Sequence, residues 1–203
     1  MKIALIDYKA GNRTSVERAL SHLGIDFCVA DLPAKLDGID KIIFPGVGEA
    51  KAAMDVLIER GLDRALREAA GAGVPILGIC IGCQVLLDDS EERSTPCLGI
   101  IAGRSRRFPA DAGVKIPQIG WNQVYHGGRH LLFDGIPDGA CFYFDHSYYP
   151  LVDNPELTVG ETTYGVPFSS AFVRNNVAAV QFHPEKSGRF GLAMLKNFAA
   201  WRA

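Results

Sequence analysis

The sequence has few cysteines, no long apolar run and no marked excess of either charge. Its five cysteines are an odd number spread over 203 residues, unlike the dense, even-numbered pattern of a secreted disulfide-stabilised domain. The 21 Lys and Arg nearly balance the 23 Asp and Glu, giving a net charge of -2. This balance argues against a nucleic-acid or anionic membrane surface. We therefore expect a reducing compartment and partners that are small molecules or proteins.

The sequence also shows neither a signal-peptide pattern nor a membrane-span pattern. The apolar run Ile3–Ile6 is too short for the core of a signal peptide. The longest uncharged stretch, residues 69–87, contains four glycines, a proline and a glutamine, which is typical of a buried strand and turn rather than a membrane span. The sequence predicts a cytoplasmic protein with no membrane contact.

Short apolar runs alternate with helical patterns in the first half of the chain. This alternation is typical of βαβ units and of a parallel sheet covered on both faces. With 48% hydrophobic residues the chain can bury a sizeable core, and no linker divides it, so we expect one domain over residues 1–203. The expected strands are residues 2–6, 25–30, 41–44 and 75–79, and the expected helices are residues 14–23 and 50–70, the latter broken near Gly61.

The second half of the chain has a different sequence pattern. Residues 88–93 read as a charged loop, and the segments that follow are short, alternating and rich in Gly and Pro. We expect antiparallel strands there, so that the sheet becomes mixed. The clearest of them are residues 140–144, 167–173 and 177–182, before a closing amphipathic helix around residues 190–198.

One cysteine has the setting of a nucleophile. Cys80 follows an apolar strand and precedes a helical pattern, with Gly78 and Gly82 two residues to either side, as in a nucleophile elbow. At a helix N-terminus, free N–H groups and the helix dipole favour the thiolate. The alternative is a small buried hydrophobic residue in a tight turn, since free cysteines are commonly buried.

A histidine and a carboxylate provide the base and the orienting acid that a nucleophilic cysteine needs. His183 follows a predicted strand, and Glu185 stands two residues later, where it can orient the imidazole ring. Alone, a His-Pro-Glu turn is more often structural. Together with Cys80 it provides the nucleophile, base and orienting acid of nucleophilic acyl transfer, which makes the catalytic interpretation the stronger one.

The segment Pro45–Gly48 joins the third strand to a helix. Its backbone N–H groups can point toward a developing oxyanion. The segment has neither a third glycine nor a Gly-Lys-Ser/Thr ending, so it is not a phosphate-binding fingerprint. The alternative is an ordinary strand-to-helix loop.

Over nearly its whole length the sequence resembles the class I (triad-type) glutamine amidotransferases, most closely the glutaminase subunits of imidazole glycerol phosphate synthase. The elbow and the His-Pro-Glu turn mark the wider superfamily. The resemblance implies a flavodoxin-like α/β fold and no cofactor or metal. The matching segments are Asp7-Tyr8, Gly11-Asn12, Ser15-Val16, Pro45-Gly46-Val47-Gly48, Gly78-Ile79-Cys80-Ile81-Gly82 with Gln84, Lys115-Ile116-Pro117 with Gly120-Trp121-Asn122, Tyr143-Phe144 with His146-Ser147-Tyr148, and Gln181 to Ser187.

The resemblance also implies roles for individual residues. Cys80 attacks the side-chain amide of glutamine, His183 relays protons and Glu185 holds His183, leaving a thioester that water cleaves. The oxyanion hole consists of the N–H of Ile81 and one from Val47 or Gly48. The implied substrate-binding residues are Gly46, Gln84, His146, Ser147 and Tyr148.

An ammonia-releasing chain of this kind implies a partner, because the sequence shows no second domain that could use the ammonia. By resemblance the partner is the (β/α)₈ cyclase subunit of imidazole glycerol phosphate synthase, in a heterodimer that serves histidine biosynthesis. The residues placed at the contact are Asn12, Ser15, Trp121, Tyr143 and Lys186. Each has a plainer explanation, as a helix-start residue, an aromatic at the edge of the core or a solvated amine.

Other interpretations stay open at this stage. The chain could serve another acceptor synthase. Cys83 stands where the family has an apolar residue and creates a Cys-x-x-Cys motif, so a thiol-disulfide oxidoreductase is a second class of function, although it leaves His183 and Glu185 unused. His126 and His130 are weak evidence for zinc and read as exposed polar residues. Asp145 is a second departure, which puts a charge near the glutamine pocket.

Overall fold

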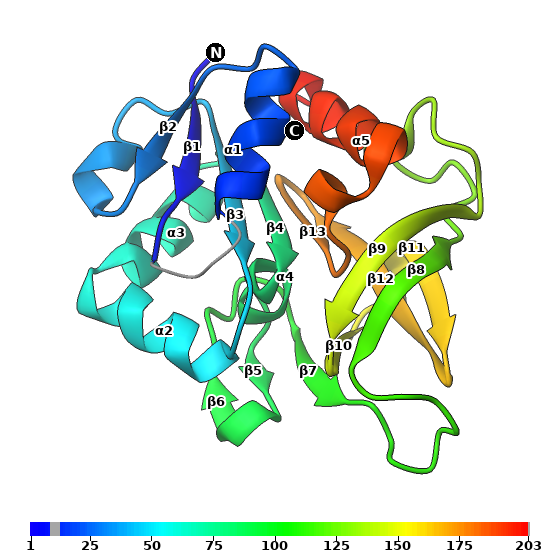
Figure 1. Ribbon diagram of the computed structural model, residues 1–203. Coiled ribbons are helices and arrows are strands. Elements are labelled where there is room, and N and C mark those ends of the chain that lie inside the picture. The colour runs from blue at the N-terminus through cyan, green and yellow to red at the C-terminus, as the bar shows by residue number, and fades with distance from the viewer. Residues whose placement is uncertain (9–12, 203) are drawn as a thin grey trace.

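The computed structural model describes residues 1–8 and 13–202, and its centre is a seven-stranded mixed sheet (Figure 1). Its strand order is β11-β12-β13-β4-β3-β1-β2, and the five strands from β13 to β2 are parallel. The antiparallel β11 and β12 extend it on one side. The bounds are β1 Ile3–Ile6, β2 Phe27–Ala30, β3 Lys41–Gly46, β4 Ile76–Cys80, β11 Thr158–Tyr164, β12 Val166–Arg174 and β13 Val177–Val180.

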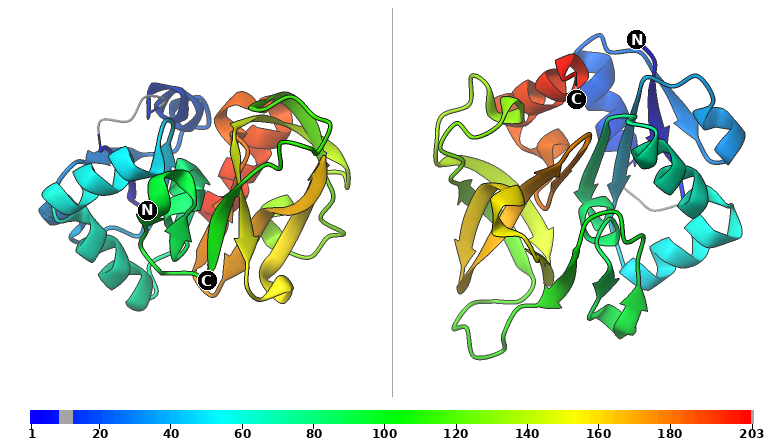
Figure 2. Two further views of the ribbon diagram at one scale, coloured as in Figure 1. Left: turned by 90° about the horizontal axis from the view of Figure 1, so that it is seen from below. Right: turned by 180° about the vertical axis from the view of Figure 1, so that it is seen from behind.

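Helices cover both faces of the parallel part (Figure 2). Alternate side chains of β1 show the two cores: Ile3 and Leu5 pack with the helices α1 (Arg13–His22) and α5 (Gly188–Ala200). Ala4 and Ile6 pack with α2 (Ala50–Glu59) and α3 (Leu62–Gly71) on the other face. Because successive side chains of a strand point to opposite faces, one apolar strand contributes to both cores.

Two smaller sheets, one mixed and one antiparallel, lie beside the central sheet. A four-stranded sheet has the order β10-β7-β5-β6, and β8 and β9 form a two-stranded ribbon. Their bounds are β5 Asp89–Ser90, β6 Thr95–Pro96, β7 Gly103–Arg107, β8 Gln118–Val124, β9 Ala140–His146 and β10 Tyr148–Val152. The short helix α4 is Ile81–Val85. The 3₁₀ turns are η1 Pro33–Leu36, η2 Glu92–Ser94, η3 Leu131–Phe133, η4 Pro155–Leu157 and η5 Pro184–Lys186.

The expected mixed α/β fold is confirmed, and so is the helix break near Gly61, which has a left-handed backbone between α2 and α3. The charged segment at residues 88–93 is not only a loop. It carries β5 and enters η2, because its residues pair with Arg104 and Ser105 of β7, a long-range partner that local charge does not reveal. The ribbon strand β8 was not predicted.

The carboxyl ends of β3, β4 and β13 meet at one edge of the central sheet, which is where open α/β sheets place their sites. The sequence motifs follow these three strands. Among the helices of the described residues, none is both long and apolar enough to cross a membrane.

Candidate active site

Cys80 lies at a sharp turn between β4 and α4. Its φ of 55° is in the left-handed region, which non-glycine residues rarely adopt. The turn is closely packed, since a Cβ at Gly82 would lie 1.8 Å from the carbonyl oxygen of Phe44 and one at Gly78 would lie 2.8 Å from that of Gly82. Only glycine fits at these two positions, so the sequence pattern around Cys80 is explained by the geometry of the elbow.

His183 caps the start of η5 and Glu185 lies within it, shortly after β13, which is the parallel neighbour of β4. His183 Nδ1 is 2.8 Å from Glu185 Oε1, and both side chains are fully buried. His183 is also hydrogen-bonded to Cys80. Ser187 secures the turn, because its hydroxyl donates to the His183 carbonyl at 2.6 Å and accepts from the N–H of Tyr143 at 2.9 Å. The structure therefore brings the three predicted catalytic side chains together.

The charge of His183 depends on these neighbours. Burial alone would lower the pKa of its imidazole, but the charge and hydrogen bond of Cys80, together with Glu185, outweigh burial and raise the pKa to about 10. A protonated imidazole beside the Cys80 sulfur is thus favoured at neutral pH. This arrangement suits nucleophilic attack by sulfur, followed by proton donation to a leaving group.

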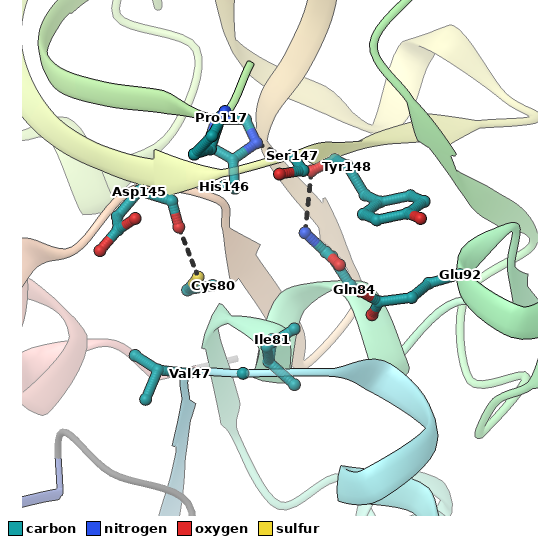
Figure 3. Close-up of a pocket in the computed structure, with 11 residues that line it drawn as sticks. Val47, Cys80, Ile81, Gln84, Glu92, Pro117, Asp145, His146, Ser147 and Tyr148 are labelled. Atoms are coloured by element: carbon teal, nitrogen blue, oxygen red, sulfur yellow. Dashed lines mark hydrogen bonds between the residues drawn. The ribbon is translucent and has the colours of Figure 1, made fainter.

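A cavity of about 260 Å³ opens at Cys80 (Figure 3). Its volume suits a ligand the size of an amino acid rather than a nucleotide. His183 is fully buried and is not among the residues that line the cavity. The lining residues are Val47, Gly48, Cys80, Ile81, Gln84, Glu92, Pro117, Asp145, His146, Ser147 and Tyr148.

Gln84 lines this cavity and has one buried acceptor without a partner among the described residues. Its Nε2 donates to the carbonyl of Tyr148 at 2.9 Å and to Oε1 of Gln181 at 2.9 Å, while its own Oε1 is buried and has no partner among the described residues. Gln181 Nε2 in turn lies 3.7 Å from Cys80 Sγ. Sequence reasoning missed Gln181 as a site residue, although it stands two residues before His183 on the same strand edge.

Glu92 was also missed, because it belongs to the segment that was interpreted as a charged loop. It lies on η2 and lines the cavity beside Gln84 (Figure 3). Its Oε2 accepts from the N–H of Ala50 at 2.7 Å, at the start of α2. Burial raises the pKa of its carboxyl, and the hydrogen bond from Ala50 partly opposes this. Glu92 and Gln84, whose buried Oε1 has no partner among the described residues, therefore both line the cavity.

The predicted oxyanion residues lie at the other end. Ile81 is the first residue of α4, directly after Cys80, and Val47 and Gly48 line the cavity after β3. Gly46 does not line it. Gly46 pairs with Cys80 across the sheet and lies against the buried hydroxyl of Tyr8, which a Cβ at Gly46 would approach to 1.7 Å. Gly46 therefore meets a packing requirement beneath the oxyanion segment, and its predicted contact with substrate stays a prediction.

The segment from His146 to Tyr148 forms the wall opposite α4. The ring of His146 packs among Phe108, Phe144 and Phe168, and its Nδ1 bonds the carbonyl of Tyr148 at 2.8 Å. Burial lowers the pKa of His146 to about 4, with a smaller contribution from the charge of His183. His146 is therefore neutral at physiological pH, and its Nδ1 proton holds the backbone carbonyl that orients Gln84.

Three of the predicted contact residues gather on one face beside the site. Trp121 on β8 makes an edge contact with Tyr143 on β9, and Lys186 Nζ lies 5.5 Å from the centre of the Tyr143 ring. Trp121 is 58% exposed. Cys141 is exposed on the same face of β9 as Tyr143. Ser15 lines a groove between α1 and α5 that reaches Glu185, and Asn12 is outside the described residues.

Comparison with known proteins identifies the family. The family model for glutamine amidotransferase class-I matches residues 4–201. This chain belongs to that family. It is 48% identical to imidazole glycerol phosphate synthase subunit HisH of Desulfovibrio desulfuricans, over 97% of this chain and 93% of the relative. It is also 48% identical to the protein of the same name from Herpetosiphon aurantiacus, over 97% and 92%.

Solved structures of lower identity share the fold of this class I amidotransferase. The structure of PurLQS from Thermotoga maritima superposes with a TM-score of 0.77 at 18% identity, covering 98% of this chain and 97% of that one. A glutamine amidotransferase from the same organism gives a TM-score of 0.65 at 17% identity, covering 98% and 81%. At these identities the likeness concerns the fold alone.

The competing interpretations find little support in the structure. Cys83 packs in the core on the α2 side, whereas Cys80 belongs to the core cluster on the α1 side, and both are free. Burial raises the pKa of Cys83 well above its usual value, which keeps it a thiol. The described residues contain no group of three or more metal-ligating side chains. The prediction that His126 is exposed was wrong, because its ring stacks on Phe133 in the core.

Proposed function

We propose that this chain hydrolyses glutamine to glutamate and ammonia and passes the ammonia to a cyclase subunit of imidazole glycerol phosphate synthase. The observation that carries the proposal is the buried Cys80, His183 and Glu185 constellation beside a cavity of amino-acid size. Membership of the class I family and the HisH relatives support it.

The reaction begins with the attack of the Cys80 sulfur on the side-chain amide carbon of glutamine. The carbonyl oxygen becomes an oxyanion, and the N–H of Ile81 stabilises it together with one from Val47 or Gly48. His183 gives its proton to the amide nitrogen, the C–N bond breaks, and ammonia leaves with a thioester on Cys80. His183 then removes a proton from water, whose oxygen attacks the thioester carbon and releases glutamate and the Cys80 sulfur.

The α-amino and α-carboxylate end of glutamine binds away from the sulfur. The carboxylate of Glu92 and the orphaned Oε1 of Gln84 are acceptors that suit an ammonium group. Ser147 and Tyr148 form the adjoining wall. Asp145 contributes its carbonyl oxygen, 3.9 Å from Cys80 Sγ, and its exposed carboxylate puts negative charge at the rim of the cavity.

The partner surface is the face defined by Ile119, Trp121, Tyr143 and Lys186. Ile119 is 61% exposed and lies on the same side of β8 as Trp121. Exposed aromatic and aliphatic side chains next to a cation are typical of the centre of a protein interface. Because this face adjoins Cys80 and Asp145, a cyclase docked there can receive ammonia without its release to solvent.

Substitution of the nucleophile tests this function. The Cys80→Ala chain, mixed with the cyclase subunit of the same organism, is expected to lose glutamine-dependent synthesis by at least about 10³-fold, because no thioester forms. Synthesis from added ammonium salt should continue, as it needs only the cyclase. Product formation with each nitrogen source is measured, and Cys83→Ser is the matched control that keeps both activities.

Two results would contradict the proposal. Glutamine use by the Cys80→Ala complex would show that another group performs the chemistry. If the wild-type chain releases ammonia from glutamine but supports no synthesis with the cyclase, its acceptor synthase is a different enzyme.

A further inference from the structure

The orientations of two buried amides beside Cys80 are fixed by one carbonyl group. The Tyr148 carbonyl can only accept, so Gln84 must turn its NH₂ group toward it. The same NH₂ group donates to Gln181, which must therefore present Oε1 to Gln84. Gln181 consequently points its own NH₂ group at Cys80 Sγ, 3.7 Å away. The chain of donors runs in one direction, from Gln84 to the sulfur.

The two ends of this series of hydrogen bonds lie next to different groups. At one end lies the nucleophilic sulfur. At the other end lies Gln84 Oε1, which is buried without a partner among the described residues. The side chains of Gln84 and Glu92 both line the cavity. Gln181 is fully buried, so water does not compete for its hydrogen bonds. In such an environment the bonds of a chain polarise one another.

We propose that Gln181 is a positioning residue that couples occupancy of the α-amino subsite to the reactivity of Cys80. The inference rests on the proposed glutaminase function. An ammonium group at Gln84 Oε1 draws electron density toward that oxygen and makes the Gln84 N–H groups stronger donors. Gln181 then becomes a stronger donor to the sulfur and holds the thiolate in place for attack. Amides that lack an α-amino group bind without this effect and react more slowly.

A cycle of two substrates and two enzymes measures the coupling. The substrates are L-glutamine and 4-carbamoylbutanoate, which has the same reacting amide and carboxylate but no α-amino group. In the wild-type complex we expect kcat to fall by about 10-fold or more on loss of the amino group, since a hydrogen bond to a charged group is lost. In Gln181→Met the two substrates should have similar kcat values, while KM still rises for the analogue in both enzymes.

Further variants distinguish a loss of coupling from a loss of folding stability. Gln181→Glu keeps an acceptor for Gln84 and nearly the same volume but has no N–H for the sulfur, so it should also lose the coupling. Gln123→Glu makes the same chemical change at an exposed position of β8 and serves as the control. Melting temperatures of all chains are compared. An unchanged kcat ratio between the two substrates in Gln181→Met and Gln181→Glu overturns the proposal.

Alkylation of Cys80 gives a readout without turnover. L-2-Aminobutyrate carries the amino-acid end of glutamine but is too short to cover the sulfur. At neutral pH it should accelerate modification of Cys80 by iodoacetamide about 3- to 10-fold in the wild-type full chain, with no acceleration by butyrate. Peptide mapping by mass spectrometry distinguishes Cys80 from the other cysteines. The same acceleration in Gln181→Met refutes the coupling, whereas a wild-type complex that releases no ammonia from glutamine refutes the proposed function itself.

Discussion

The pKa values of two histidines near Cys80 are shifted in opposite directions, and the structure shows why. His183 is buried beside Cys80 and Glu185, whose interactions with the imidazolium outweigh burial and keep it protonated. His146 is buried among aromatic rings, where no carboxylate compensates for the loss of water. The first is suited to donate a proton, and the second is a neutral group that orients a backbone carbonyl.

The lowered pKa of His146 predicts a loss of stability in acid. The unfolded chain binds a proton at His146 near pH 6.5, whereas the folded chain does so only near pH 4. Between these values unfolding takes up a proton, so the free energy of unfolding falls as pH falls, by at most about 1.4 kcal/mol per pH unit. Urea titrations at pH 7, 6 and 5 measure the slope, and His146→Asn should reduce it. Equal slopes would show that His146 titrates normally.

At the scale of elements, α5 holds the turn that carries His183 and Glu185. Gly191, in the first turn of α5, lies so close to η5 that a Cβ would be 1.8 Å from the carbonyl oxygen of Pro184. The obstacle is backbone, which cannot rotate away as a side chain can. The position of the turn that carries His183 and Glu185 is therefore set by the contact between α5 and η5.

Gly191→Ala should consequently separate α5 from η5. We expect the free energy of unfolding to decrease by about 1–3 kcal/mol, as for other overpacked sites, with a lower kcat for glutamine hydrolysis because His183 is displaced. Gly71→Ala is the matched control: this glycine is the last residue of α3, and its added Cβ meets nothing within 4 Å. Denaturant unfolding and ammonia release are measured for both. Equal stability of the two variants would contradict the close packing.

The sequence predicted the parallel core and its turns well because local patterns determine them. The glycines around Cys80, the break at Gly61 and the apolar strands each reflect a steric or burial requirement within a few residues. The antiparallel part depends on pairing between distant segments, such as Asp89 with Arg104, and was predicted less completely. Glu92 and Gln181 were missed for the same reason, since their roles arise from neighbours that are remote in sequence.

At the scale of the whole molecule, the sheet edge that carries Cys80 and His183 adjoins the exposed face that carries Trp121 and Tyr143. Tyr143 connects them, because its carbonyl accepts from the N–H of His183 while its ring contacts Trp121 and Lys186. A partner that docks on this face would thus contact β9, the strand that is hydrogen-bonded to His183.

Trp121→Ala is expected to weaken binding of the cyclase by about 10- to 100-fold, as for an exposed aromatic at an interface centre. The melting temperature of the isolated chain should change little, since the side chain is mostly exposed. Leu32→Ala, an exposed apolar residue at the start of η1, is the control. Titration calorimetry with the cyclase gives the affinities. Equal affinity of the two variants for the cyclase would show that the cyclase docks on another surface.

The exposed thiol of Cys141 offers a natural attachment point for a spectroscopic label. It lies on β9 two residues from Tyr143 and directly across the ribbon from Gln123, near the Trp121 indole. In the Cys80→Ala background a maleimide fluorophore can be coupled there without engineering a new cysteine. Its emission then reports subunit assembly in real time, independently of turnover.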